Sequence, residues 1–237
     1  VSFAIKELED YYGIRLFERI GRRISPTETG KNFYGYALNI VSIFDEMEKK
    51  IRNWDALGTV RIGASITIGT HILPSLIKNY QTLYPDLRTE VNIRQSAAIE
   101  QQIVDNKADI GMIETQPNHP DIVSLPFMED FLCPIVSTDH PLAKYQKITL
   151  TQLAEYPFLM REKGSAGREI LDACFALQHI GIRPLWESSS TQAIVRGVAE
   201  GLGVAVLPFL LVKKDIEEHT VKTIPFDQPL KRKLNII

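Results

Sequence analysis

The chain has 237 residues, of which 44% are hydrophobic, and its formal net charge is −2. It can therefore bury one large core or two smaller ones, and its total charge argues neither for nor against a nucleic-acid partner. Two distant cysteines, Cys133 and Cys174, form no CxxC motif, which argues against a disulfide framework or a zinc site. The longest apolar run, residues 203–212, is broken by Pro208 and is about half as long as a membrane span, so we expect no membrane association and a cytoplasmic location.

Both ends of the sequence read as interrupted. Val1 is not an initiating methionine and opens directly into a helical pattern, and residues 234–237 read as the start of a strand. We therefore expect a fragment of a longer protein.

The first 26 residues combine a helix with an arginine-bearing hairpin. Residues 3–12 have one apolar helical face that ends at Gly13, and residues 14–24 form two short strand-like pieces around Gly21. Such a helix can enter a DNA major groove while the hairpin contacts phosphates or a minor groove, so the pattern predicts part of a winged helix. A solvated surface remains the alternative for the arginines. The cluster consists of Arg15, Arg19, Arg22 and Arg23, opposed by Glu18 alone.

A long helix is predicted from Thr27 to Leu57. Its apolar positions alternate at spacings of four and three, which is a heptad pattern, while charged residues fill the positions between them. Gly30 and Gly35 weaken its first turns. We interpret this helix as a connector that also dimerises, although packing on its own domain would also explain the stripe. The stripe consists of Phe33, Ala37, Ile40, Phe44, Met47, Ile51 and Trp54.

From Gly58 the pattern changes to alternating strands and helices, which predicts a parallel sheet with right-handed crossovers. The extended segment 123–136 interrupts the alternation, as a crossing between two lobes would, and no finer repeat is visible. The predicted strands are 60–64, 89–93, 109–113, 157–161, 184–187 and 204–207, and the predicted helices are 72–84, 97–106, 150–155, 168–177 and 191–200.

The N-terminal motifs resemble the DNA-binding signature of LysR-type transcriptional regulators. The matching runs are 1–9, 13–19 and 27–30, which in that family join the recognition helix, the wing and the start of the linker helix. The resemblance implies that promoter DNA is the partner of this region. The candidate DNA-binding residues are Ser2, Phe3 and Lys6 in the helix and Arg19, Arg22 and Arg23 in the hairpin.

The resemblance extends over nearly the whole chain. Residues 58–65, Asp109-Ile110-Gly111, His140-Pro141-Leu142-Ala143 and 198–208 are similar to landmarks of the family's effector-binding domain. The implied fold class is α/β, with a partial winged helix-turn-helix, a linker helix and two Rossmann-like subdomains similar to periplasmic binding proteins. The implied divisions are 1–30 for DNA binding, 31–57 for the linker and dimerisation helix, and 58–237 for effector binding, with lobe I at about 58–135, lobe II at about 136–225 and an incomplete return to lobe I.

Four predicted junctions between a strand and a helix carry hydroxyl or amide side chains. Each would place free backbone N–H groups and the positive end of a helix dipole at the carboxyl edge of a sheet, where open α/β folds bind ligands. They predict a site for a small anion, unless the serines are ordinary N-caps. The junctions are 65–70, 95–96, 164–165 and 188–192.

The resemblance implies that Ser65 and Thr67 line the effector cleft. Glu114 also falls at a cleft position, where it would repel an anion. Arg161 is the candidate to compensate Glu114, unless Glu114 points away or the effector carries a cationic group. The candidate ligand-binding residues are Ser65, Thr67, Gln95, Ser96, Glu114, Arg161, Ser165 and Thr191.

Enzyme motifs are weak in this sequence. Gly201-Leu202-Gly203 resembles part of a dinucleotide fingerprint, but it follows a helix and precedes a strand, the reverse of what a phosphate loop requires. There is no GxSxG, HExxH, GKS or GKT motif, and the histidines are never paired at ligand spacing. We therefore expect no enzyme, no cofactor and no metal.

The interpretation from sequence is a LysR-type regulator whose partners are promoter DNA, a small-molecule effector and further copies of itself in a homodimer or homotetramer. A solute-binding receptor without a DNA role explains residues 58–237 but leaves residues 1–57 without a purpose. An α/β enzyme working in the same cleft needs a nucleophile or an acid–base pair that the sequence does not offer.

Overall fold

The N-terminal part contains the predicted helix and hairpin. The structure, a computed structural model, describes residues 2–20, 23–52 and 58–237. Helix α1 (Ser2–Tyr12) is followed by the antiparallel strands β1 (Phe17–Ile20) and β2 (Arg23–Pro26), as expected from the pattern. Gly13, with a φ of 64°, ends α1, a backbone conformation that glycine adopts without strain. The predicted turn at Gly21 lies outside the described residues.

Side-chain hydrogen bonds tie the hairpin to the helices on either side. The Glu9 carboxylate accepts a bond of 2.7 Å from the backbone N–H of Leu16. The Thr27 hydroxyl accepts one of 2.9 Å from Gly30 N–H, which caps the next helix, and donates one of 2.7 Å to the Arg15 carbonyl. A Cβ on Gly30 would lie 2.0 Å from the Leu16 carbonyl oxygen. Gly30 therefore permits a close backbone approach and does more than weaken the helix.

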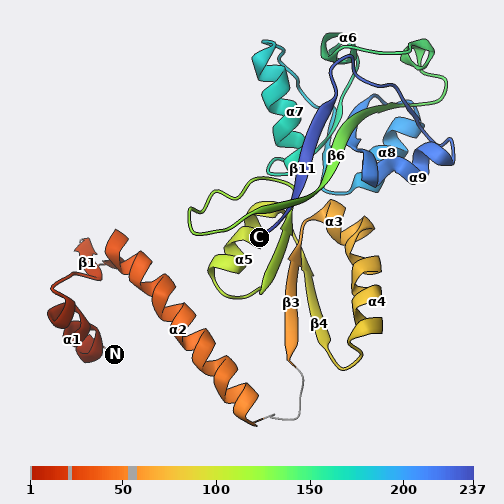
Figure 1. Cartoon of the computed structure of the whole chain (residues 1–237). Coiled ribbons are helices and arrows are strands. Elements are labelled where there is room, and N and C mark those ends of the chain that lie inside the picture. Colours follow the sequence, from red (N-terminus) through yellow and green to blue (C-terminus); the bar gives the residue numbers. More distant parts are fainter. Residues whose placement is uncertain (1, 21–22, 53–57) are drawn as a thin grey trace.

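Helix α2 (Glu28–Arg52) carries the heptad stripe, and the last predicted stretch, 53–57 with Trp54, lies outside the described residues. Figure 1 shows α2 as one long helix that follows the winged part in the chain. Several stripe residues remain uncovered in the single chain: Ile40, Phe44 and Met47 are 68%, 55% and 45% exposed. An apolar stripe of this kind is typical of a helix that packs against a partner.

The rest of the chain is built on one seven-stranded sheet. Its order is β10-β6-β11-β5-β3-β4, with β9 also paired to β6. Two long strands, β6 (Leu125–Val136) and β11 (Leu230–Ile236), run antiparallel through the centre and connect the two halves (Figure 1). The segment predicted as a crossing is therefore β6, and the predicted strand at 234–237 begins earlier, at Leu230.

We call the first half lobe I. Its strands β3, β4 and β5 are parallel, as predicted, and Figure 1 shows α5 on one side of them with α3 and α4 on the other. Its core includes Ala64, Ile68 and Met112 together with Leu234 of β11. Lobe I consists of β3 (Thr59–Ala64), α3 (Ile66–His71), α4 (Leu73–Leu83), β4 (Arg88–Ile93), α5 (Ser96–Val104) and β5 (Ile110–Ile113).

We call the second half lobe II. Two buried apolar clusters form its core, one around Phe158 and Phe175 and the other around Ile194 and Leu207. Strands β7 and β8 are a parallel pair, while β9 and β10 run antiparallel to β6. Lobe II consists of the 3-10 helix η1 (Pro141–Lys144), α6 (Leu150–Ala154), β7 (Leu159–Arg161), α7 (Ala166–Leu177), β8 (Trp186–Ser188), α8 (Thr191–Ala199), β9 (Ala205–Pro208), α9 (Phe209–Glu217) and β10 (Lys222–Thr223).

Four of these elements do not follow from the periodicity. Helix α3 has six residues and η1 has four, too few for a helical period to stand out. Helix α9 begins directly after Pro208, inside the apolar run that the sequence reads as one broken stretch, and β10 contains only two residues.

Candidate effector-binding site

A small cavity lies where strand ends of lobe I meet strand ends of lobe II. Its volume is about 20 Å³, enough for about one water molecule. Seven of the eight candidate residues line it, and the eighth, Thr191, accepts a hydrogen bond of 3.1 Å from Arg161 Nη1. The lining residues are Ser65, Ile66, Thr67, Gln95, Ser96, Glu114, Arg161, Gly164, Ser165, Ala166 and Pro208.

Two helix N-termini and a buried hydroxyl give this cavity anion-binding groups. Helices α5 and α7 begin at Ser96 and Ala166, both in the lining, so their dipoles present positive ends to the cavity. The residues before them, Gln95 and Ser165, make no side-chain cap hydrogen bond. The buried hydroxyl of Ser65 has no hydrogen-bond partner of good geometry. A ligand oxygen placed here would meet donors that the protein leaves available.

Glu114 is paired with Arg232, so the expectation that Arg161 compensates it is wrong. Arg232 Nη1 donates to Glu114, while its Nε and Nη2 donate to Asp130 at 2.9 and 2.6 Å. Arg232 Nη2 also donates to the Thr67 hydroxyl at 3.1 Å. All four side chains are buried, and the one cation faces two carboxylates. Arg232 lies in the last strand of the sheet, and the sequence carries no motif that marks it.

The Glu114 carboxyl remains charged within this network. Burial, the largest effect, raises its pKa, but the Arg232 charge and the nearby donors of Ser65 and Thr67 together bring the pKa below its ordinary value. Thr67 N–H donates to one carboxylate oxygen at 3.0 Å, and Glu114 N–H donates to the Ser96 hydroxyl at 3.2 Å. Glu114 is therefore tied to two other lining residues: its carboxylate accepts from the Thr67 backbone, and its backbone N–H donates to Ser96.

Arg161 forms its ion pair with the next residue in the chain. Its Nε and Nη2 donate to the Glu162 carboxylate at 2.9 and 3.1 Å. Burial raises the pKa of the Glu162 carboxyl, yet the hydrogen bonds from Arg161 and Gln95 outweigh it and lower the pKa overall. Arg168 supports this arrangement from α7 by donating to the Arg161 carbonyl at 2.8 Å.

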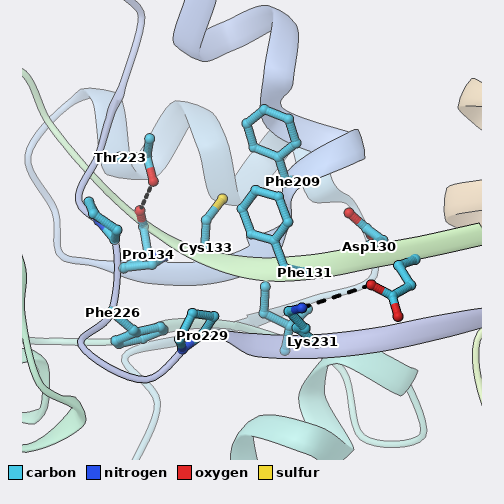
Figure 2. Close-up of a pocket in the computed structure, with 12 residues that line it drawn as sticks. Asp130, Phe131, Cys133, Pro134, Phe209, Thr223, Phe226, Pro229 and Lys231 are labelled. Carbon is cyan, nitrogen blue, oxygen red and sulfur yellow. Dashed lines mark hydrogen bonds and ion pairs between the residues drawn. The ribbon is translucent and has the colours of Figure 1, made fainter.

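A second cavity, of about 450 Å³, lies beside β6 and β11 (Figure 2). Aromatic and proline side chains dominate its lining, and the rings of Phe131 and Phe209 stack at 4.7 Å between centroids. Lys231, the cation in the lining, lies 3.9 Å from the Glu129 carboxylate. Burial raises the pKa of the Cys133 thiol there to about 12, so it is protonated and unreactive at neutral pH. This lining does not suit a small anion.

The candidate DNA-binding residues lie on the N-terminal helix and hairpin. Ser2, Phe3 and Lys6 belong to α1, where Phe3 and Lys6 are exposed, and Arg19 is exposed on β1. Arg23 begins β2, and Arg22 lies outside the described residues.

Residues 2–20, 23–52 and 58–237 lack two kinds of feature. These residues contain no group of three or more histidine, cysteine, aspartate or glutamate side chains placed to hold a metal ion. Within the same ranges, every helix is too short or too polar to pass through a membrane.

A winged DNA-binding element joined through a long helix to a two-lobed ligand-binding unit defines a class of ligand-responsive transcriptional regulators. The family comparison agrees: residues 55–237 match the LysR substrate binding domain, and residues 1–31 match the bacterial regulatory helix-turn-helix protein of the lysR family. The chain belongs to the LysR family of transcriptional regulators, which confirms the resemblance, the α/β fold class and the regulator function predicted from the sequence.

The relatives are themselves regulators. The chain is 34% identical over 229 residues to the HTH-type transcriptional regulator YeiE of Escherichia coli K12, covering 97% of this chain and 77% of YeiE. It is 34% identical over 242 residues to the HTH-type transcriptional regulator CysL of Bacillus subtilis 168, covering 100% of this chain and 80% of CysL. These similarities support the regulator and not the solute-binding receptor.

A solved structure shows the same fold with a ligand. The regulatory domain of CcmR from Synechocystis PCC6803, in complex with 2-PG, superposes with a TM-score of 0.70 at 26% identity, covering 76% of this chain and 86% of CcmR's.

Proposed function

We propose that the small cavity between the lobes is the effector site of this regulator and that the effector is a small anion. The observation that carries the proposal is the meeting of two helix N-termini, the Arg161 guanidinium and the unpartnered Ser65 hydroxyl in one lining. The Glu114 carboxylate would repel an anionic effector, but its ion pair with Arg232 reduces that repulsion.

The parts of the chain have separate roles in this proposal. Residues 1–30 contact DNA, residues 31–57 hold subunits together through the exposed stripe of α2, and residues 58–237 bind the effector. Effector binding shifts the closure of the lobes and the packing of subunits, which changes the spacing and bend with which paired winged elements engage a promoter. The regulator acts in the cytoplasm as a homodimer or homotetramer and performs no catalysis.

The size of the cavity sets a requirement on binding. A space for about one water molecule does not hold a whole sulfate or carboxylic acid, so we expect the groups around the cavity to move apart when an effector enters. The effector class includes inorganic oxyanions and small carboxylates, and the 2-PG bound by CcmR is a natural addition to a test panel.

A thermal-shift screen tests the site. Sulfate, sulfite, phosphate, nitrate, 2-PG and small carboxylates are compared on the wild type and on Ser65→Ala, which removes a hydroxyl that makes no internal hydrogen bond of good geometry. A ligand at about a hundred times its Kd adds roughly 2.7 kcal/mol of stability, a shift of several degrees. Ser65→Ala should lose that shift while melting like the wild type without ligand.

The matched control is Ser124→Ala, because the Ser124 hydroxyl is also buried and unpartnered but does not line the cavity. It should keep the full shift. Thr67→Val is less suitable, since it also removes an acceptor from the buried Arg232. If no anion of the panel raises the melting temperature of the wild type, the small-anion proposal is wrong.

A further inference from the structure

Arg161 is the cation in the cavity lining, and its guanidinium is already paired with the carboxylate of Glu162. The Nε and Nη2 edge of its guanidinium holds both oxygens of Glu162, and Nη1 donates to Thr191. The Arg161 side chain is 5% exposed, so water does little to screen this ion pair. Glu162 thus takes the bidentate position that an anionic ligand of Arg161 would use.

The same carboxylate also joins the two lobes. Gln95, at the N-terminus of α5 in lobe I, donates from Nε2 to Glu162 Oε1 at 3.1 Å. Gly164, with a φ of 83°, allows this approach, because a Cβ at that position would lie 3.2 Å from Gln95 Oε1. One carboxylate therefore neutralises Arg161 of the lining and bonds to Gln95 of the other lobe.

The two arginines that contact the cavity lining from outside are already paired with carboxylates. Arg232 is committed to Glu114 and Asp130, and Arg168 forms ion pairs with Asp172 and Glu187. An anion that enters while Glu162 still holds Arg161 meets an arginine whose charge is already balanced. When the anion takes the place of the Glu162 carboxylate on Arg161, the arginine charge is balanced again, because the ligand then supplies the negative charge. Glu162 is 20% exposed, so its carboxylate has access to water once released.

We infer that Glu162 is a resident carboxylate that the effector displaces from Arg161, and that the displacement breaks the Gln95–Glu162 bond between the lobes. The inference rests on the proposed function of the cavity. It defines the ligand class as a molecule with two anionic oxygens on one centre, such as a carboxylate, sulfate or phosphate, because only such a group replaces both contacts of Glu162. Glu162 thereby sets the affinity and couples binding to lobe separation.

Calorimetric titration of sulfate, phosphate and 2-PG into wild type and Glu162→Gln tests the inference. Glutamine keeps the size of the side chain but removes the competing charge, so the Kd of the bound anion should fall by about tenfold, which corresponds to about 1.4 kcal/mol. Glu162→Asp keeps the charge but shortens the reach, and its Kd should lie between the two. If Glu162→Gln does not fold, the Kd of Glu162→Asp is compared with that of the wild type instead.

Two further variants separate this mechanism from a general change of charge. Glu187→Gln removes a carboxylate from the neighbouring Arg168 and should leave the Kd unchanged. Combining Arg161→Met with Glu162→Gln should abolish the gain in affinity. An equal or higher Kd in Glu162→Gln would overturn the inference while wild-type binding still supports the proposed function. No binding by either protein overturns both.

Discussion

Arg232 and Asp130 are direct cross-strand partners on β11 and β6, and their side chains form a buried salt bridge at 2.6 Å. The same guanidinium binds Glu114 at the end of β5, so three strands share one cation. The two strands that connect the lobes are therefore fixed to the lining of the proposed effector site.

Removal of Arg232 should be strongly destabilising. Arg232→Met leaves two buried carboxylates without a cation, which costs about 3 to 5 kcal/mol of unfolding free energy, and Arg232→Lys should cost less because it keeps the charge. The control is Lys231→Met on the exposed side of the same strand, expected to stay within about 0.5 kcal/mol of the wild type. Urea denaturation measures all three, and an Arg232→Met midpoint equal to that of the wild type would contradict this account.

Alanine substitutions at two glycines of α2 should change the stability of the protein in opposite directions. Gly30→Ala places a Cβ against the Leu16 carbonyl and should lower stability by about 1 to 3 kcal/mol. Gly35→Ala meets nothing within 4 Å and should raise stability by about 0.5 to 1 kcal/mol through better helix propensity. Thermal unfolding followed by circular dichroism compares them, and a stabilising Gly30→Ala would show that the close approach is absent in solution.

Only part of the architecture was accessible from the sequence. The periodic elements β3 to β5, α4, α5, α7 and α8 were predicted because each has a local pattern of apolar residues. The placement of β11 between β5 and β6 was not, since pairing between segments about a hundred residues apart leaves no local signal.

The candidate site, like the fold, could be predicted only in part from the sequence. Junction chemistry and family resemblance identified the residues that line the cavity, because each follows a predicted strand or carries a recognisable motif. Arg232, which balances Glu114, was missed, since its role depends on a contact across 118 residues of chain. Glu162 was not identified as a site residue, because only the folded lobes bring its carboxylate to Gln95.

His140 should make stability depend on pH. Burial lowers its pKa below 6.5, and its Nδ1 accepts a hydrogen bond from Leu142 N–H, which requires an unprotonated nitrogen. As the pH falls, His140 is therefore protonated in the unfolded chain before it is protonated in the folded protein. The contribution of His140 to stability is full above about pH 6.5, and it is lost as the pH falls through the lower pKa of the folded state. Burial lowers the pKa of His71 as well, in the same direction.

Urea unfolding at pH 7.5 and 5.5 measures this loss. His140→Asn keeps an acceptor for Leu142 N–H but cannot titrate, so its loss between the two pH values should be smaller than that of the wild type. An NMR titration should place the His140 pKa below 6.5, and a value above 6.5 would refute the prediction.

The stripe of α2 should control association. Phe44→Glu places a charge among exposed apolar residues and should shift the full-length regulator toward monomer in sedimentation velocity, with at least a tenfold weaker dimer as a rough expectation. Asp45→Lys lies toward the opposite side of the helix and should leave the sedimentation coefficient unchanged. Equal behaviour of the two variants would assign the subunit contact elsewhere.

Arg19 and Lys6 should affect DNA binding differently in the full-length regulator. Arg19→Ala should weaken binding to all duplexes similarly and reduce the slope of log K against log salt by about 0.9, as expected for one lost phosphate contact. Lys6→Ala should relax discrimination between operator variants if the side chain reads a base edge. Fluorescence anisotropy at several salt concentrations distinguishes these effects. If the slope of log K against log salt is unchanged in Arg19→Ala, Arg19 does not contact a DNA phosphate.

The sheet order has a consequence for synthesis. Strand β11 lies between β5 and β6 in the sheet, yet it follows both of them in the sequence, so a ribosome releases it after both of its partners. Until residues 230–236 emerge, the facing edges of β5 and β6 remain unpaired, and each is a template for wrong strand pairing. The nascent chain therefore carries two open edges from the emergence of β6 until that of β11, and the arrival of β11 joins β5 to β6 and brings Arg232 to Asp130 and Glu114 in one event.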